Sequence, residues 1–133
     1  MPIPTELFAT IMAPIAADSS PEPATEAIRV WHTLFRKFSP LLGSLSTELL
    51  FARTLAMHAS DYPWLPRVAP AVARSAFEEF ERSLDARGTE DIVAANHALL
   101  ASYTTGLVSL IGAGLTTRLL QAAFPDNKTN TNT

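Results

Sequence analysis

The side chains that could do chemistry in this chain are three histidines, and there is no cysteine to act as a nucleophile or a thiolate ligand. His58 and His97 lie in apolar stretches, without the HExxH pattern or the i,i+4 histidine pair that marks a metal site on a helix. Histidines in such surroundings are usually hydrogen-bonded core residues. Asn96, His97 and Tyr103 allow a second interpretation, a polar pocket that binds a small apolar ligand. We predict no catalytic, cofactor-binding or metal site and keep this internal pocket as an alternative function.

The third histidine, His32, lies in the segment WHTLFRK, where two cations follow it by one helical turn. This segment resembles the phosphoacceptor helix of histidine phosphotransfer domains, which are also small helical bundles. The resemblance implies that His32 accepts a phosphoryl group. That family usually has lysine and glycine where this chain has Phe35 and Arg36. The more ordinary expectation is a histidine at the edge of the apolar stripe of its helix.

Acidic residues gather in one segment, at Glu78, Glu79 and Glu81. General acid–base catalysis needs carboxylates in environments that separate their pKa values. The helical spacing of this segment places the three side chains on a face turned to water. All three then share one environment, which does not separate their pKa values. We therefore do not expect an enzyme.

Composition favours a protein partner over a nucleic acid. The 133 residues are 47% hydrophobic and 17% charged, against a usual charged fraction of about 25%. A surface with so little charge is expected to be covered in part by another subunit or a partner protein, and a homodimer is the simplest case. The net charge of −3 and the single adjacent cation pair, Arg36 and Lys37, argue against nucleic acid. The absence of cysteine and of a basic signal-peptide start predicts a cytoplasmic protein.

One long segment, residues 92–117, has no Asp, Glu, Lys or Arg. Such a segment is either a membrane span or a helix surrounded by protein. Frequent polar residues make it a poor match to the about 20 apolar residues of a spanning helix. We favour a buried helix and keep membrane association through this segment as a further alternative. Small residues recur along it at helical spacing and would let a neighbouring helix approach closely; the predicted interface comprises Ala98, Ser102, Gly106, Ser109 and Ala113.

Every periodic segment has the three- and four-residue spacing of a helix, and none alternates as a strand does. We predict an all-α fold, a compact bundle of five to six helices forming a single domain at residues 1–124, with a disordered polar tail at residues 125–133. Prolines are expected to interrupt the first helix at Pro14 and to end the second at Pro40. The predicted core contains Trp31, Phe35, Leu49, Leu55, Phe80, Leu100, Leu107 and Ile111.

Two glycine-containing segments echo each other, LLGSLSTELLFA from Leu41 and LIGAGLTTRLLQA from Leu110. They align when Gly114 is treated as one extra residue. The alignment predicts an internal pseudo-twofold of two helix pairs, each pair broken at its glycine, or else a chance likeness of two helix junctions. Duplication would place Leu45 and Leu115 at equivalent core positions. The aligned identities include Gly43/Gly112, Leu45/Leu115, Thr47/Thr117, Leu49/Leu119 and Leu50/Leu120.

Overall fold

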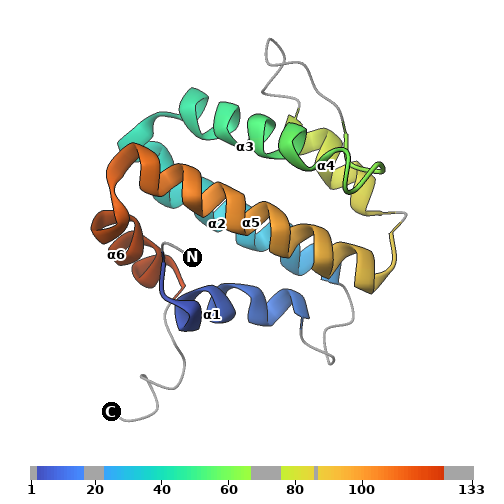
Figure 1. Cartoon of the computed structure of the whole chain (residues 1–133), viewed down its shortest axis with the longest axis horizontal. Helices are drawn as coiled ribbons and strands as arrows, with labels where there is room; N and C mark the ends of the chain where they lie inside the picture. The colour runs from blue at the N-terminus through green and yellow to red at the C-terminus, as the bar shows by residue number, and fades with distance from the viewer. Residues whose placement is uncertain (1–2, 17–22, 67–75, 86, 125–133) are drawn as a thin grey trace.

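The protein is a bundle of helices, as a computed structural model shows (Figure 1). The structure describes residues 3–16, 23–66, 76–85 and 87–124, and within these ranges there are six helices and no strand. The predicted all-α fold is confirmed; the predicted tail at 125–133 lies outside the described residues. The helices are α1 (Thr5–Ala16), α2 (Pro23–Leu42), α3 (Ser44–His58), α4 (Ala76–Leu84), α5 (Thr89–Ile111) and α6 (Ala113–Ala123).

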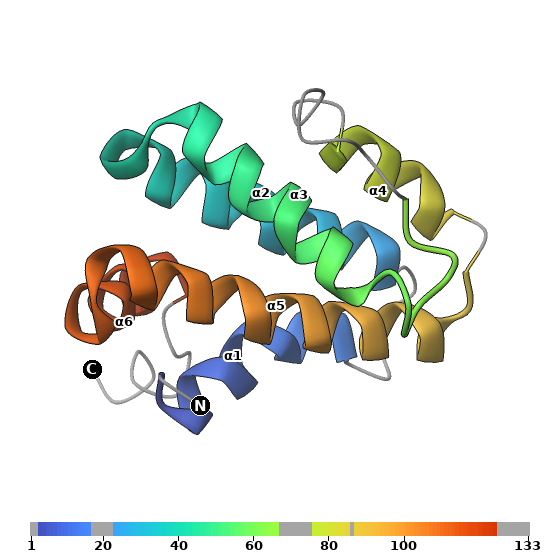
Figure 2. The ribbon, with the colours of Figure 1, turned by 45° about the horizontal axis from the view of Figure 1, so that its top comes forward.

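The two longest helices, α2 and α5, lie side by side and run in the same direction (Figures 1 and 2). Helix α3 turns back from the end of α2 and packs on α5, while α6 turns back from the end of α5 and packs on α2. Helix α1 lies mainly against α2, and α4 lies against α3 and α2. This reciprocal packing is the arrangement expected of two units related by a pseudo-twofold.

The core is centred on the indole of Trp31, which is fully buried. The rings of Phe51 and Tyr103 lie edge-on to it, with centroids 4.9 and 5.2 Å away. Such edge-to-face pairs add stability beyond the apolar area that they bury. The core prediction is confirmed in part, because three of its members lie at the rim of the helix contacts and are only half-buried. Trp31, Leu55, Phe80, Leu100 and Leu107 are buried, and Phe35, Leu49 and Ile111 are half-buried.

The predicted helix breaks at Pro14 and Pro40 are wrong, because α1 and α2 both continue past their prolines. The fixed φ of proline is itself helical, and its penalties are one lost hydrogen bond and a local clash. In α2 the buried Phe38 and the half-buried Leu42 flank Pro40 and hold the last turn against the core. Tertiary packing therefore outweighs the local preference.

Both predicted glycine junctions interrupt the helix, and the two glycines share one backbone conformation. Gly43 has φ +89° and ψ 148°, and Gly112 has φ +91° and ψ 155°. In each, the glycine N–H donates to the carbonyl four residues earlier, to Ser39 O at 2.7 Å and to Val108 O at 2.8 Å. This φ lies in the left-handed region, which side chains with a Cβ rarely adopt. The turns therefore depend on glycine at these two positions.

The aligned register of the two units differs from the predicted one by a residue. The hydroxyl of Thr47 donates to Gly43 O, at 3.4 Å, and the hydroxyl of Thr116 donates to Gly112 O, at 2.8 Å. Thr47 thus corresponds to Thr116 and not to Thr117, and Gly114 is no insertion.

When Gly43 is aligned with Gly112, buried positions in α1, α2 and α3 match buried positions in α4, α5 and α6. The equivalent packing is confined to the two helix pairs, α2–α3 and α5–α6, because α1 packs mainly on α2 whereas α4 packs mainly on α3 and α2 and not on α5. The buried pairs are Leu7/Ala76, Ile11/Phe80, Ile15/Leu84, Ala27/Asn96, Val30/Leu99, Trp31/Leu100, Leu34/Tyr103, Phe38/Leu107, Thr47/Thr116 and Phe51/Leu120.

The predicted core positions of Leu45 and Leu115 are wrong. Both side chains are exposed, at 57% and 40%. Each lies in the first turn after a glycine junction, where the helix begins at the end of the bundle and has no layer beyond it (Figure 1).

Candidate interaction surfaces

The residues of the predicted internal pocket do not come together. Asn96 and Tyr103 are buried in the face of α5 that meets α2, whereas His97 is exposed. The imidazole of His97 instead lies edge-on to Phe8 of α1, with ring centroids 4.9 Å apart. The three side chains therefore do not line one cavity.

The polar atoms of Asn96 and Tyr103 are bonded within the fold. The Trp31 indole N–H donates to Asn96 Oδ1 at 2.8 Å, and the Asn96 amide donates to Ile92 O at 2.8 Å. The Tyr103 hydroxyl donates to Thr47 O at 3.2 Å and so ties α5 to α3. Buried polar groups need such partners, because an unpaired one costs about 1–3 kcal/mol. These side chains hold the two units together.

Tyr103 also makes the free energy of unfolding change with pH in the alkaline range. Burial raises the pKa of its phenol above the ordinary value of 10.0. Above about pH 10 the unfolded chain loses this proton and the folded chain keeps it, so rising pH favours unfolding. The free energy of unfolding should fall by at most about 1.4 kcal/mol per pH unit through this group. Urea unfolding measures the free energy of unfolding across pH 9–11.5, roughly the range that brackets the pKa of a free phenol. With rising pH this free energy should fall less steeply for Tyr103→Phe than for the unchanged protein, and equal slopes would contradict the prediction.

Two members of the predicted small-residue interface serve a contact inside the chain. Ser102 Oγ and His58 Nε2 of α3 lie 2.6 Å apart. A Cβ placed on Gly106 would lie 2.7 Å from Leu50 Cδ1, so the absent side chain lets α3 approach α5 closely. Ala98 is half-buried. The other two predicted interface residues, Ser109 and Ala113, are exposed at the end of the bundle.

His32 is exposed on α2, and its ring lies edge-on to Phe77 of α4, with centroids 5.0 Å apart. This is the position at the margin of the core that its helical spacing predicts. The phosphoacceptor role stays a prediction. Within the described ranges, no three histidine or carboxylate side chains come together as a metal site requires.

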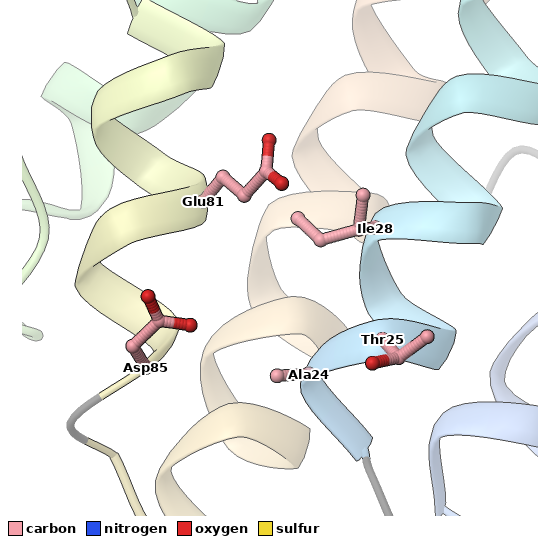
Figure 3. A pocket seen from close by; sticks show the side chains of 5 residues that line it. All are labelled: Ala24, Thr25, Ile28, Glu81 and Asp85. Atoms are coloured by element: carbon pink, nitrogen blue, oxygen red, sulfur yellow. The ribbon is translucent and has the colours of Figure 1, made fainter.

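The acidic helix α4 faces a small depression beside the beginning of α2 (Figure 3). Glu81 and Asp85 reach toward Ala24 and Ile28 across a volume of about 170 Å³. A second depression of about 390 Å³ adjoins it and shares Ala24, Thr25 and Asp85 with it. Both carboxylates are exposed, so this end of the molecule presents acidic groups to water.

Large exposed apolar residues flank the two glycine junctions in the sequence. Both junctions lie at the opposite end of the bundle (Figures 1 and 2). Of the five large exposed apolar residues in the described ranges, only Met57 lies away from the junctions. The others are Leu41, Leu45, Leu110 and Leu115.

These four leucines fall into two groups of residues that differ in charge. The first, here called the neutral end, consists of exposed uncharged residues: Leu45, Ser46, Ser109, Leu110 and Ala113. The second, here called the cationic groove, is a depression of about 510 Å³ between α2 and α6, lined by Arg36, Lys37, Pro40, Leu41, Leu115 and Leu119.

The chain shows no match to a protein-family model, a curated protein or a solved structure. In the part of the chain that the structure describes, no helix combines the length and apolar character needed to cross a membrane.

Proposed function

We propose that this protein is a non-enzymatic helical interaction module of the cytoplasm that associates with a second copy of itself through the neutral end. The observation that carries the proposal is the exposure of Leu110, at 59%, between the exposed and uncharged Ser109 and Ala113. Leaving a large apolar side chain in water, rather than burying it, costs roughly 1.5–3 kcal/mol. An interface that covers Leu110 recovers this free energy.

The chemistry of the neutral end suits pairing with itself. A symmetric dimer brings the same surface of each subunit together, so any charge on that surface would meet a like charge. Leu45, Ser46, Ser109, Leu110 and Ala113 carry none. The small side chains of Ser109 and Ala113 also allow a neighbouring backbone to approach closely.

Replacing Leu110 with serine should weaken self-association. Each isologous interface contains the residue twice, so the dimer dissociation constant should rise at least about tenfold. Light scattering over a range of concentrations measures the change. Met57→Ser is the matched control, because Met57 is 66% exposed and lies on α3 away from the glycine junctions.

Self-association through the neutral end should change little with ionic strength, since screening acts on charges and this end has none. A protein that remains monomeric at every concentration, or a dimer that Leu110→Ser leaves intact, would refute self-association through this surface.

A further inference from the structure

The cationic groove is lined by four apolar residues and two cations. Pro40, Leu41, Leu115 and Leu119 supply the apolar part of the lining, from the last turns of α2 and from α6. Arg36 and Lys37 lie one turn before Pro40 and Leu41 on α2. A surface of this kind offers apolar contact and ionic contact to the same ligand.

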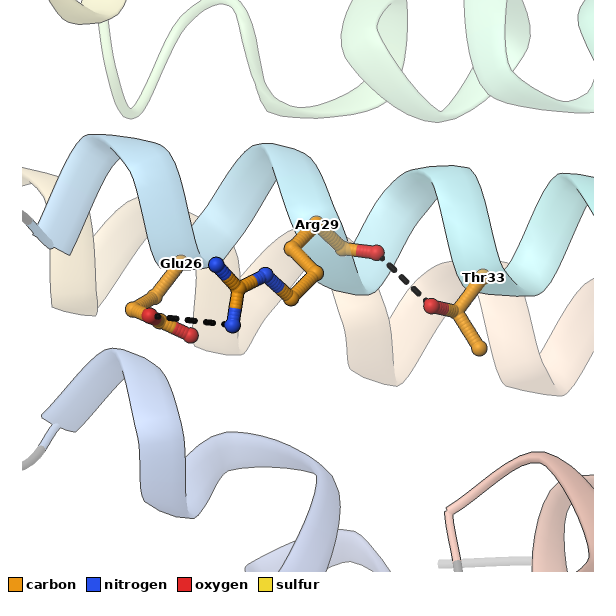
Figure 4. Close-up of polar contacts among 3 residues, drawn as sticks. All are labelled: Glu26, Arg29 and Thr33. Carbon is orange, nitrogen blue, oxygen red and sulfur yellow. Dashed lines mark hydrogen bonds and ion pairs between the residues drawn. The ribbon is translucent and has the colours of Figure 1, made fainter.

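The two cations of the groove are not neutralised by the described part of the chain. Arg29, two turns earlier on α2, forms an ion pair with Glu26 at 3.5 Å (Figure 4). Arg36 and Lys37 have no such partner among the described residues. The two helices that line the groove contain no Asp or Glu apart from Glu26, which lies near the beginning of α2. The groove therefore attracts a negatively charged ligand.

The internal repeat shows why this groove is open. At the separation of Gly43 and Gly112, Lys37 corresponds to Gly106, and Leu119 corresponds to Leu50. In the counterpart, Leu50 of α3 lies directly on Gly106 and fills the space. A lysine at the equivalent position of α2 does not leave room for Leu119 to approach in the same way. The two units differ here in a manner that creates a binding surface.

We propose that the cationic groove binds an amphipathic helix of another protein, with leucine-like side chains on one face and glutamate or aspartate beside them. The apolar side chains would cover Leu41 and Leu115, and the carboxylates would pair with Arg36 and Lys37. A helix suits this surface because the described part of the protein offers no sheet edge that an extended peptide could join. A second copy docked symmetrically on the groove would place cations against cations.

Binding of designed peptides to the full-length protein tests this assignment. The first probe is a fluorescein-labelled, four-turn helical peptide with leucines at i, i+4 and i+7 and glutamates on both flanks. The second probe has the same leucines and lysines in place of the glutamates. Fluorescence anisotropy at low and high salt measures both affinities.

We expect the glutamate peptide to bind at least about tenfold more tightly than the lysine peptide, with the difference shrinking at high salt. The charge reversal Arg36→Glu with Lys37→Glu should invert this preference. Leu115→Ser should weaken binding of either peptide. Circular dichroism of each variant shows whether it has kept the helical fold, and the reversed preference cannot arise from unfolding.

Equal affinity for the two peptides, or a preference that the charge reversal leaves unchanged, would overturn the assignment. Association with vesicles of phosphatidylserine and phosphatidylcholine, without peptide binding, would overturn it in favour of a membrane surface. The Leu110→Ser variant separates this inference from the proposed self-association, because it changes the neutral end and leaves the groove residues intact. If Leu110→Ser is monomeric and still binds the glutamate peptide, the result supports the proposal for the cationic groove independently of self-association.

Discussion

Replacing Trp31 with alanine should lower the free energy of unfolding by about 3–5 kcal/mol, the range for removing a fully buried large aromatic side chain. Trp31 has no exposed surface and lies edge-on to Phe51, Phe80 and Tyr103. Its removal would open a cavity where α2, α3, α4 and α5 meet. Urea unfolding followed by far-ultraviolet circular dichroism measures the loss.

Two further variants show which property of Trp31 matters. Trp31→Phe keeps a ring but leaves Asn96 Oδ1 without its 2.8 Å donor, and it should cost about 1–3 kcal/mol. Trp64→Phe is the control. Trp64 is half-buried, and the Arg87 guanidinium lies 5.6 Å from its ring centroid, so this change should cost less than about 1 kcal/mol. Similar losses for Trp31→Ala and Trp64→Phe would show that the core is not centred on Trp31.

Replacing Gly43 or Gly112 with alanine should cost about 1–3 kcal/mol each, from backbone strain alone. A Cβ at either position would meet no atom within 4 Å, so crowding contributes nothing. The penalty comes from φ near +90°, which alanine adopts poorly. Because the two sites lie in separate junctions, the losses in the double variant should be nearly additive. Urea unfolding of the two single variants and the double variant measures them.

Gly114 is the matched control for this prediction. It lies within the first turn of α6, two residues after Gly112, and a Cβ there also meets nothing within 4 Å. It is not among the positive-φ glycines, so Gly114→Ala should be neutral or stabilise the helix by up to about 1 kcal/mol. Equal effects at Gly112 and Gly114 would contradict the role assigned to the left-handed junction.

The sequence by itself determined the helical class and several members of the core. Helical spacing of apolar residues is a local signal, and it identified Trp31, Leu100 and Leu107 as buried. It also identified the breaks at Gly43 and Gly112, because glycine supplies a backbone conformation that other residues avoid. Local rules gave wrong answers at Pro14 and Pro40, because both helices continue past the proline. At Pro40, packing of the flanking residues Phe38 and Leu42 outweighs the proline penalty.

The register of the repeat depended on hydrogen bonds that no alignment of letters contains. Identity matching favours Thr117 as the partner of Thr47, since that choice also aligns several leucines. The structure pairs Thr47 with Thr116, because each hydroxyl bonds the carbonyl of the glycine four residues earlier. Matching leucines misled the sequence comparison, since Leu45 and Leu115 are exposed and contribute nothing to the shared core.

Only the tertiary structure decided where the two proposed binding surfaces lie. Arg36 and Lys37 are visible in the sequence as a cation pair, and Leu115 and Leu119 as ordinary helix residues. They form one groove because α6 folds back from Gly112 onto α2, a contact between segments far apart in the chain. The same folding places Leu110 at the end of the bundle, with no layer beyond it to cover its side chain. Periodicity reports which face of a helix is apolar, but the packing of neighbouring helices determines how much of that face remains exposed.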